Sequence, residues 1–329
     1  MRPEAVEDML VAELEEVIGE VQDAWELEEG LNTVYVLETG RGEYVLKART
    51  NDRNELSWFR AEPRIYSMLE DRENVPSPRV LYTDLSRERY ENAFYVMERL
   101  EGRNADSVRD EMSERQLELV LRQYGRILGE IHSAHSFEGY GMLAGEAGEL
   151  RVEDAAEIWP CALEGSTDSW IERIEDGWEN VEIGRPSEEE IRATVPGDPG
   201  ASLAHMDNRL DNLLVKDGDI TGFLDWSHPE TADPEYDLYT AEYLLIDWDL
   251  SFREEPVDHE KMREALFSGY EEARPREEVS RERRRLYRYA TVLWLMSGFL
   301  NWGSGFPEEK KRRFRKDLRE RLEREKPGL

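Results

Sequence analysis

The sequence predicts an α+β fold with a β-rich N-terminal part and a mostly helical C-terminal part. Two β-rich runs flank a Thr-Gly-Arg-Gly turn within residues 34–48, a pattern typical of an antiparallel hairpin. Apolar residues later recur at helical spacing, most clearly over residues 116–132, 286–300 and 308–325. The change of period predicts a mostly antiparallel sheet with one helix up to about residue 100, followed by a region of helices.

Two helices are expected to accompany the N-terminal sheet. Residues 3–19 are amphipathic and predict an opening helix. Residues 58–69 also have a helical pattern, but they contain Pro63. Because proline is tolerated mainly in the first turn of a helix, this helix is expected to begin late, near Pro63. The apolar run over residues 93–100 predicts a further strand, which ends at a Glu-Gly pair.

Residues 143–200 have the weakest pattern, and three tryptophans are spaced through them: Trp159, Trp170 and Trp178. One interpretation is that Trp170 and nearby acidic residues line a pocket for an amine-bearing substrate. These acidic residues are Asp168, Glu172 and Glu175. The other interpretation is that the tryptophans pack in the core while the acidic side chains are solvated. The high average burial of tryptophan favours the core interpretation.

The most specific pattern of polar residues lies between His205 and Asp225. A His-x-Asp-x-x-x-x-Asn loop contains Asp207 and Asn212, and it is followed by two short apolar runs around a Lys-Asp-Gly-Asp turn. This order predicts a hairpin with a polar loop at one end and a carboxylate at the other. Phosphoryl transfer requires one carboxylate facing the attacking hydroxyl and oxygen ligands that hold magnesium on the phosphates, and these residues supply both.

This stretch resembles the catalytic loop of the aminoglycoside phosphotransferase and choline kinase family, small-molecule kinases distantly similar to protein kinases. The family usually reads His-Gly-Asp-x-x-x-x-Asn, then Ile-Asp-Trp or Ile-Asp-Phe, then Gly-Asp-Pro-x-x-Asp-Leu. Residues 232–238 read Ala-Asp-Pro-Glu-Tyr-Asp-Leu and differ from the third block only at its first position. Three blocks in the family order form a far more specific signal than a single glycine-rich loop.

The resemblance spans roughly residues 20–245 and implies a two-lobed, protein-kinase-like fold. The N-terminal nucleotide-binding lobe would comprise residues 1–98, with an antiparallel sheet and a helix. Residues 99–102 would form a hinge. Residues 103–329 would form a mostly helical catalytic and substrate-binding lobe.

The resemblance also implies roles for single residues. Asp207 would orient and deprotonate the acceptor hydroxyl, while Asn212 and Asp225 would bind Mg²⁺. Structural support of the loop is implied for His205, Arg209 and Asp237.

A nucleotide site for ATP or GTP is implied in the N-terminal lobe. Lys47 is the sole lysine in residues 1–215 of a chain with 36 Arg and 7 Lys. A compact ammonium reaches two phosphates as a point charge, which a planar guanidinium does less well. Glu62 on the following helix is the implied ion-pair partner. The other implied nucleotide-binding residues are Gly30, Asn32 and Thr33 in a short loop, and Glu98 and Leu100 at the hinge.

The chain departs from the family pattern in its catalytic loop. Met206 replaces the usual glycine, so the backbone there is expected to avoid angles that only glycine adopts. Asn208-Arg209-Leu210 replaces the Leu-His-Pro common in antibiotic kinases, so antibiotic resistance does not follow from the resemblance. Arg209 is expected to bind the transferred phosphate or to neutralise Asp207. Asp211 is interpreted as a solvated residue.

Composition limits the classes of partner. The formal net charge of −32 makes binding to nucleic acid or to an anionic membrane unfavourable on average. No run of about 18 apolar residues is present, and the N-terminus lacks the apolar stretch of a signal peptide. Cys161 is the only cysteine, which excludes an internal disulfide and a multi-cysteine zinc site. We therefore expect a cytoplasmic protein; the resemblance implies a small-molecule hydroxyl acceptor, and the sequence does not predict the oligomeric state.

The acidity has two interpretations. The chain has 75 Asp and Glu against 43 Lys and Arg, and the acids are spread along its whole length. Scattered carboxylates with few lysines are typical of a halophile, where molar salt screens charges beyond roughly 3 Å. A surface that attracts a polyamine-like or aminoglycoside substrate is the alternative. The even spread of the charge favours the halophilic interpretation.

The sequence thus predicts a Mg²⁺-dependent kinase that transfers the γ-phosphoryl group of ATP or GTP to a small-molecule alcohol. A non-catalytic nucleotide-binding or interaction protein of the same fold, a pseudokinase, is the alternative. A protein kinase is a third option, but the chain lacks a glycine-rich phosphate loop and an Ala-Pro-Glu block.

Overall fold

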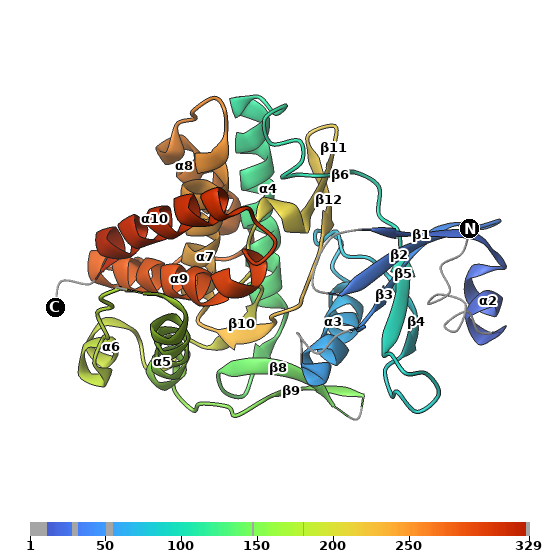
Figure 1. The fold of residues 1–329 in the computed structure, drawn as a ribbon, viewed down its shortest axis with the longest axis horizontal. Coiled ribbons are helices and arrows are strands. Elements are labelled where there is room, and N and C mark those ends of the chain that lie inside the picture. The colour runs from blue at the N-terminus through green and yellow to red at the C-terminus, as the bar shows by residue number, and fades with distance from the viewer. Residues whose placement is uncertain (1–11, 28–31, 51–54, 147, 180, 327–329) are drawn as a thin grey trace.

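The computed structural model describes residues 12–27, 32–50, 55–146, 148–179 and 181–326, arranged as two lobes (Figure 1). The N-terminal lobe is built on a five-stranded antiparallel sheet in the order β1-β2-β3-β5-β4. Its strands are β1 (Val21–Leu27), β2 (Thr33–Thr39), β3 (Gly42–Ala48), β4 (Val80–Asp84) and β5 (Phe94–Glu98). The predicted hairpin is β2–β3, in which Val34 lies opposite Lys47.

The two faces of this sheet are covered by different helices. α2 (Ala12–Ile18) packs Leu14 and Ile18 against Leu46 and other buried residues of one face. Because side chains alternate along a strand, Lys47 points to the opposite face, which α3 (Leu56–Leu69) covers. The predicted opening helix is present over its last turns, and its residues before Ala12 lie outside the described part of the chain.

The prediction that the second helix begins near Pro63 is wrong. α3 begins at Leu56, and Pro63 lies inside it. The amide of Phe59 already donates to the carbonyl of Glu55 at 3.0 Å, so the first turn forms well before the proline. Proline lacks an amide hydrogen and removes one bond from the ladder. The buried side of α3, which includes Phe59, Ile65 and Leu69, offsets this loss.

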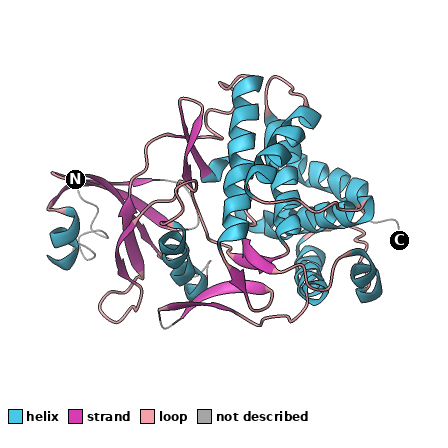
Figure 2. Cartoon of the chain, turned by 180° about the vertical axis from the view of Figure 1, so that it is seen from behind, coloured by secondary structure: helices cyan, strands magenta, loops and turns pink. Residues whose placement is uncertain are grey.

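The C-terminal lobe is mostly helical, as Figures 1 and 2 show. Its helices are α4 (Glu114–Ala134), α5 (Trp159–Gly177), α6 (Glu188–Thr194), α7 (Pro234–Ala241), α8 (His259–Ala273), α9 (Arg281–Trp302) and α10 (Glu308–Glu325). A π-helical segment, η2 (Glu242–Trp248), and a short 3₁₀ segment, η3 (Asp249–Phe252), follow α7. The predicted long helix is α4, which begins at a capping box formed by Ser113 and Gln116. The predicted fold class is therefore confirmed.

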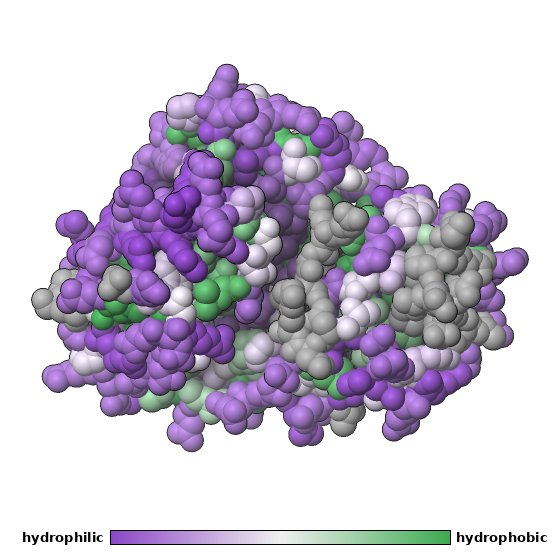
Figure 3. Space-filling model, in the orientation of Figure 1, coloured by the Kyte–Doolittle hydropathy of each residue, from purple (hydrophilic) through white to green (hydrophobic). Residues whose placement is uncertain are grey.

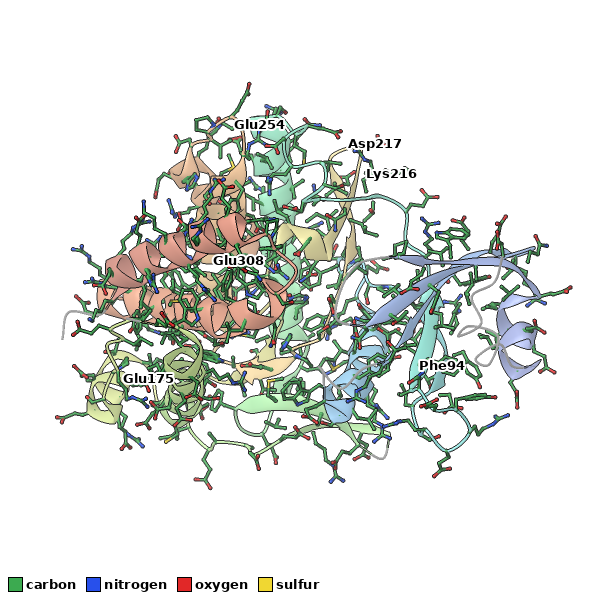
Figure 4. The ribbon with its side chains drawn as sticks, in the orientation of Figure 1. Phe94, Glu175, Lys216, Asp217, Glu254 and Glu308 are labelled. Carbon is green, nitrogen blue, oxygen red and sulfur yellow. The ribbon has the colours of Figure 1, made fainter. Side chains whose placement is uncertain are left out.

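Two small sheets position the loops of the C-terminal lobe. One has the order β7-β10-β13-β8-β9 and the other the order β12-β11-β6. Their strands are β6 (Arg103–Asn104), β7 (Ser136–Phe137), β8 (Gly141–Glu146), β9 (Glu149–Val152), β10 (Ala201–Ala204), β11 (Leu213–Lys216), β12 (Asp219–Phe223) and β13 (Glu230–Ala232). The hairpin predicted after the polar loop is β11–β12, and Figure 4 labels Lys216 and Asp217 at its tip. A 3₁₀ turn, η1 (Leu210–Asn212), joins the polar loop to β11.

Further contacts among the described residues hold residues 99–102 and α3 to the C-terminal lobe. β6, just after β5, pairs with β11, and a Cβ on Gly102 would lie 2.5 Å from the hydroxyl of Thr221. The β8–β9 hairpin extends from the C-terminal lobe to pack on α3 (Figure 1). The indole of Trp58 on α3 also donates to Glu153 after β9 at 3.1 Å. α3 is thus held from both lobes.

The three tryptophans of residues 143–200 pack in the hydrophobic core. Trp159, Trp170 and Trp178 are 3%, 7% and 6% exposed, which confirms the core interpretation. The indole of Trp178 donates to the carbonyl of Met296 at 3.1 Å. Asp168 pairs with Arg185 at 2.7 Å on the surface.

The surface seen in Figure 3 is mostly hydrophilic and is hollowed between the lobes. Within the described residues, no helix combines the length and the apolar character needed to span a bilayer.

Candidate active site

Lys47, Glu62 and Asp225 meet where the two lobes face each other. Nζ of Lys47 lies 2.8 Å from each carboxylate oxygen of Glu62 and 3.1 Å from Oδ1 of Asp225. Lys47 and Glu62 are buried, whereas the side chain of Asp225 is 37% exposed. Two carboxylates therefore share one ammonium at the floor of the site.

The charges of this cluster reinforce each other. Burial by itself lowers the pKa of Lys47, but the charges of Asp225 and Glu62 outweigh burial and raise that pKa above its ordinary value. Burial likewise favours protonated Asp225, yet Lys47 and a hydrogen bond from Ser227 hold the pKa of Asp225 well below its usual range. Both groups stay charged at neutral pH, as phosphate and metal binding require.

Asn212 and Asp225 have oxygen atoms suited to magnesium. Nδ2 of Asn212 donates to the carbonyl of Asp207 at 2.8 Å, which fixes the orientation of the amide. Within the described part of the chain, neither Oδ1 of Asn212 nor Oδ2 of Asp225 accepts a hydrogen bond. Amide and carboxylate oxygens are ligands of a hard cation, so the donor set fits Mg²⁺. No group of three or more His, Cys, Asp or Glu side chains forms a metal site among the described residues.

Asp207 is held by Arg209. Nε and Nη2 of Arg209 donate to the two carboxylate oxygens of Asp207 at 2.6 and 3.0 Å, a bidentate pair. Burial raises the pKa of Asp207, but the charge of Arg209 and its hydrogen bonds outweigh burial and leave that pKa below its ordinary value. Asp207 is thus ionised and oriented.

Two further aspartates surround Arg209. Oδ2 of Asp211 lies 3.0 Å from Nη1 of Arg209, so Asp211 is not merely solvated. Burial and nearby carboxylates raise the pKa of Asp211 to about 6 even though Arg209 opposes the shift. Oδ2 of Asp249 accepts a hydrogen bond from the amide of Leu210 at 2.7 Å and fixes the following turn.

The carboxylate of Asp237 binds the backbone of the polar loop. Its carboxylate is fully buried and accepts hydrogen bonds from the amides of His205 and Met206, each at 2.9 Å. Asn208 donates to the same carboxylate at 2.6 Å, and His132 of α4 contacts it at 3.1 Å. Four polar groups thus converge on one side chain.

His205 and Met206 complete the loop. Nε2 of His205 lies 3.0 Å from the carbonyl of Leu224, next to Asp225. Met206 has a φ of +62°, in the left-handed region that favours glycine but is accessible to other residues at a cost. The bond from the Met206 amide to Asp237 holds this conformation.

Four of the five other predicted nucleotide-binding residues lie in the described part of the chain. Gly30 is outside the described residues. Asn32 is buried, and the hydroxyl of Thr33 contacts that of Thr50. Glu98 ends β5, where its side chain pairs with Arg79, and Leu100 follows in the linker between the lobes.

Sequence reasoning missed several residues of the site. They are Tyr66, His132, Asn208, Ser227 and Asp249. Tyr66 lies one helical turn after Glu62, so its place on the same face was open to prediction from helix spacing. His132 lies next to Ile131 on the buried side of α4, which was the available signal for a buried histidine.

Solved structures share this fold. Aminoglycoside phosphotransferase APH(4)-Ia superposes with a TM-score of 0.62 at 18% identity, covering 98% of this chain and 99% of that chain. ADP-bound APH(2'')-Ib has a TM-score of 0.59 at 16% identity, covering 97% of this chain and 100% of that chain. Macrolide 2'-phosphotransferase MphH from Brachybacterium faecium has a TM-score of 0.57 at 19% identity, covering 94% and 96% of the two chains.

The family itself is shown by sequence. No curated protein matches the chain. Residues 26–279, which form well over half of the chain and include both the Lys47 strand and the polar loop, match the phosphotransferase enzyme family. The chain therefore belongs to the phosphotransferase enzyme family.

Proposed function

We propose that the protein transfers the γ-phosphoryl group of ATP or GTP to a hydroxyl group of a small molecule, with Mg²⁺ as cofactor. The observation that carries the proposal is that Nζ of Lys47 joins Glu62 and Asp225, on elements far apart in sequence, beside an oriented Asp207. Family membership supports the reaction class. Two neighbours support a nucleotide donor and a small-molecule acceptor: APH(2'')-Ib was solved with ADP, and a thermostable mutant of APH(4)-Ia was solved with AMP-PNP and hygromycin B.

The nucleotide would bind between the lobes. Lys47, oriented by Glu62, binds the α- and β-phosphates through its ammonium. The backbone of Glu98 and Leu100 would face the base, and the short loop of Gly30, Asn32 and Thr33 would bind the phosphates. Magnesium held by Asn212 and Asp225 would neutralise charge on the phosphates. Residues 1–98, 99–102 and 103–329 then act as nucleotide lobe, hinge and acceptor lobe.

Asp207 and Arg209 would act on the acceptor. The acceptor oxygen forms a bond to the γ-phosphorus while the bond from that phosphorus to the β–γ bridging oxygen breaks, releasing ADP or GDP. The hydroxyl proton passes to Asp207. Arg209 keeps Asp207 ionised and positioned before transfer and lies close enough to neutralise charge around it. His205 and Asp237 support the loop through its backbone.

One observation favours a second candidate, a non-catalytic nucleotide-binding protein. Both oxygens of Asp207 are bound by Arg209 in this structure, so the carboxylate has an intramolecular partner where a substrate would bind. In an active kinase the acceptor hydroxyl would donate a hydrogen bond to Asp207, either beside the two bonds from Arg209 or in place of one of them. In a pseudokinase the pair would persist.

The test is nucleotide turnover in molar KCl with Mg²⁺ and a panel of acceptors: aminoglycosides, macrolides, choline, amino alcohols and sugars. We expect acceptor-dependent ADP or GDP formation that Asp207→Ala abolishes while nucleotide binding persists. Wild-type turnover in this variant would contradict the mechanism. Nucleotide binding without turnover on any acceptor would favour the pseudokinase, and absence of nucleotide binding would contradict the site.

We further propose a cytoplasmic, salt-adapted protein from a halophile, on the strength of its net charge of −32. The repulsion between carboxylates is long-ranged in dilute buffer, since the Debye length is about 10 Å at 0.1 M salt and about 3 Å at 1 M. The melting temperature should rise steeply with KCl over this range, measured by circular dichroism. Equal stability in dilute buffer and in molar KCl would contradict the proposal, and sucrose serves as an uncharged control.

A further inference from the structure

Tyr66 connects α3 to the loop that carries Asp225. It lies one turn after Glu62 and is 1% exposed. Its hydroxyl donates to Oε1 of Glu62 at 3.2 Å and accepts a hydrogen bond from the backbone amide of Asp225 at 3.0 Å. The next amide, that of Trp226, donates directly to Glu62 at 3.2 Å. Two consecutive amides of the loop are thus anchored to one turn of α3.

The backbone of Asp225 needs such an anchor. Asp225 has a φ of +66°, in the left-handed region that L-residues rarely adopt. A residue keeps such a conformation only where its surroundings impose it. Its amide has Tyr66 as partner, while Oδ1 of its carboxylate is held by Lys47 and by the hydroxyl of Ser227. Backbone and side chain together fix where Oδ2 lies.

We propose that Tyr66 is a positioning residue for the metal ligand Asp225, acting through its hydroxyl group. Its hydroxyl holds Asp225 in the left-handed conformation that presents Oδ2 to magnesium, and it links this conformation to the Glu62 carboxylate that orients Lys47. The inference rests on the proposed function, in which Asp225 binds magnesium on a nucleotide. Tyr66 lies outside the sequence motif, 159 positions before Asp225.

The effect of the hydroxyl is separable from that of the ring. Tyr66→Phe keeps the buried ring and removes only the oxygen. Tyr289→Phe is a matched control, since Tyr289 is also fully buried and its hydroxyl donates to a backbone carbonyl, that of Gly184, at 2.6 Å. Both variants lose one buried hydrogen bond to the backbone, and Tyr66→Phe also loses the bond to Glu62; only Tyr66 contacts the metal-binding loop.

The experiment is calorimetric titration of ADP into wild type, Tyr66→Phe and Tyr289→Phe, each with and without Mg²⁺. We expect magnesium to increase the ADP affinity of wild type and of Tyr289→Phe equally. In Tyr66→Phe this increase in affinity should be roughly five- to tenfold smaller than in wild type. The affinity of the variant for metal-free ADP should stay within about twofold of the wild-type value. If magnesium increased the ADP affinity of Tyr66→Phe as much as that of wild type, the inference would be overturned while the proposed function would stand. Absence of ADP binding to wild type would overturn the proposed function and the inference together.

A second measurement keeps the inference testable should Tyr66→Phe fold poorly. In wild-type protein without ligand, hydrogen exchange of the Asp225 amide should be as slow as that of the neighbouring Trp226 amide, because both are anchored to α3. Fast exchange at Asp225 beside slow exchange at Trp226 would contradict the anchor. In a folded Tyr66→Phe, protection should be lost at Asp225 and retained at Trp226.

Discussion

Lys47 and Asp225 are 178 residues apart in the chain, yet Nζ of Lys47 lies 3.1 Å from Oδ1 of Asp225. The same ammonium also contacts both oxygens of Glu62. A single positive charge therefore offsets two carboxylates between the lobes. This arrangement binds the N-terminal sheet, α3 and the loop after β12 together.

Lys47→Met is expected to lower the free energy of unfolding as well as nucleotide affinity. The variant leaves Glu62 buried without a cation, and breaking a buried ion pair from one side costs about 3–5 kcal/mol. Denaturant unfolding measures the loss. Lys216→Met is the control, because Lys216 also pairs with a glutamate, Glu101, but on the exposed surface, and its loss should be far smaller. Equal losses in the two variants would contradict a buried cluster.

Gly145 permits the contact between the β8–β9 hairpin and α3. A Cβ at this position would lie 2.5 Å from the carbonyl carbon and oxygen of Arg60, and backbone atoms cannot move aside as a side chain can. Gly145→Ala should therefore cost about 1–3 kcal/mol of stability. Gly165→Ala in α5 meets open space and should instead stabilise by up to about 1 kcal/mol, since alanine favours helix. A neutral Gly145→Ala would show that the hairpin can shift freely.

Asp237→Asn is expected to disorder the polar loop. The carboxylate accepts from two backbone amides and from Asn208, and an asparagine would place its own N–H₂ group against some of these donors. Leaving buried donors unpaired should cost about 3 kcal/mol or more, and turnover should fall with it. Asp198→Asn, which alters an exposed aspartate bonded to Tyr140, is the control for the chemical change. Wild-type turnover in Asp237→Asn would mean that the loop keeps its shape without this anchor.

The parts of the site that sequence could predict are those that are local. Asp207 and Asn212 lie within six residues of each other, and β11–β12 then brings Asp225 back to the loop, so order and spacing sufficed. The family resemblance implied a lysine on a strand of the N-terminal lobe, and Lys47 is the only lysine in residues 1–215. The fold class followed from periodicity, which reports which face of each element is buried.

The remainder depends on contacts between distant segments. Helix spacing places Tyr66 beside Glu62 and His132 on the buried side of α4, but the bonds of these residues to the Asp225 amide and to Asp237 join segments 159 and 105 residues apart. The start of α3 was misjudged because the local rule for proline was overridden by burial of the helix against the sheet and the hairpin. Local reasoning thus fails where tertiary packing decides.

Glu235 should make the stability of the protein depend on pH. It is 2% exposed, Oε1 accepts from the amide of Glu277 at 2.8 Å, and burial raises the pKa of Glu235 from 4.5 to about 7. Between these two pKa values the folded protein binds more protons than the unfolded chain, so this group's contribution to the free energy of unfolding decreases as pH rises. The full loss above pH 7 amounts to about 3 kcal/mol.

Glu235→Gln removes this charge and keeps a carbonyl oxygen for the Glu277 amide. The variant should therefore be more stable than wild type by about 2–3 kcal/mol near pH 8, and the difference should shrink toward pH 5, where the folded-state carboxyl is protonated. Denaturant unfolding at both values in molar KCl measures it. Glu230, whose pKa burial also raises to about 7, is present in both proteins and cancels in the comparison. A stability difference that is the same at the two pH values would mean that Glu235 is not the titrating group.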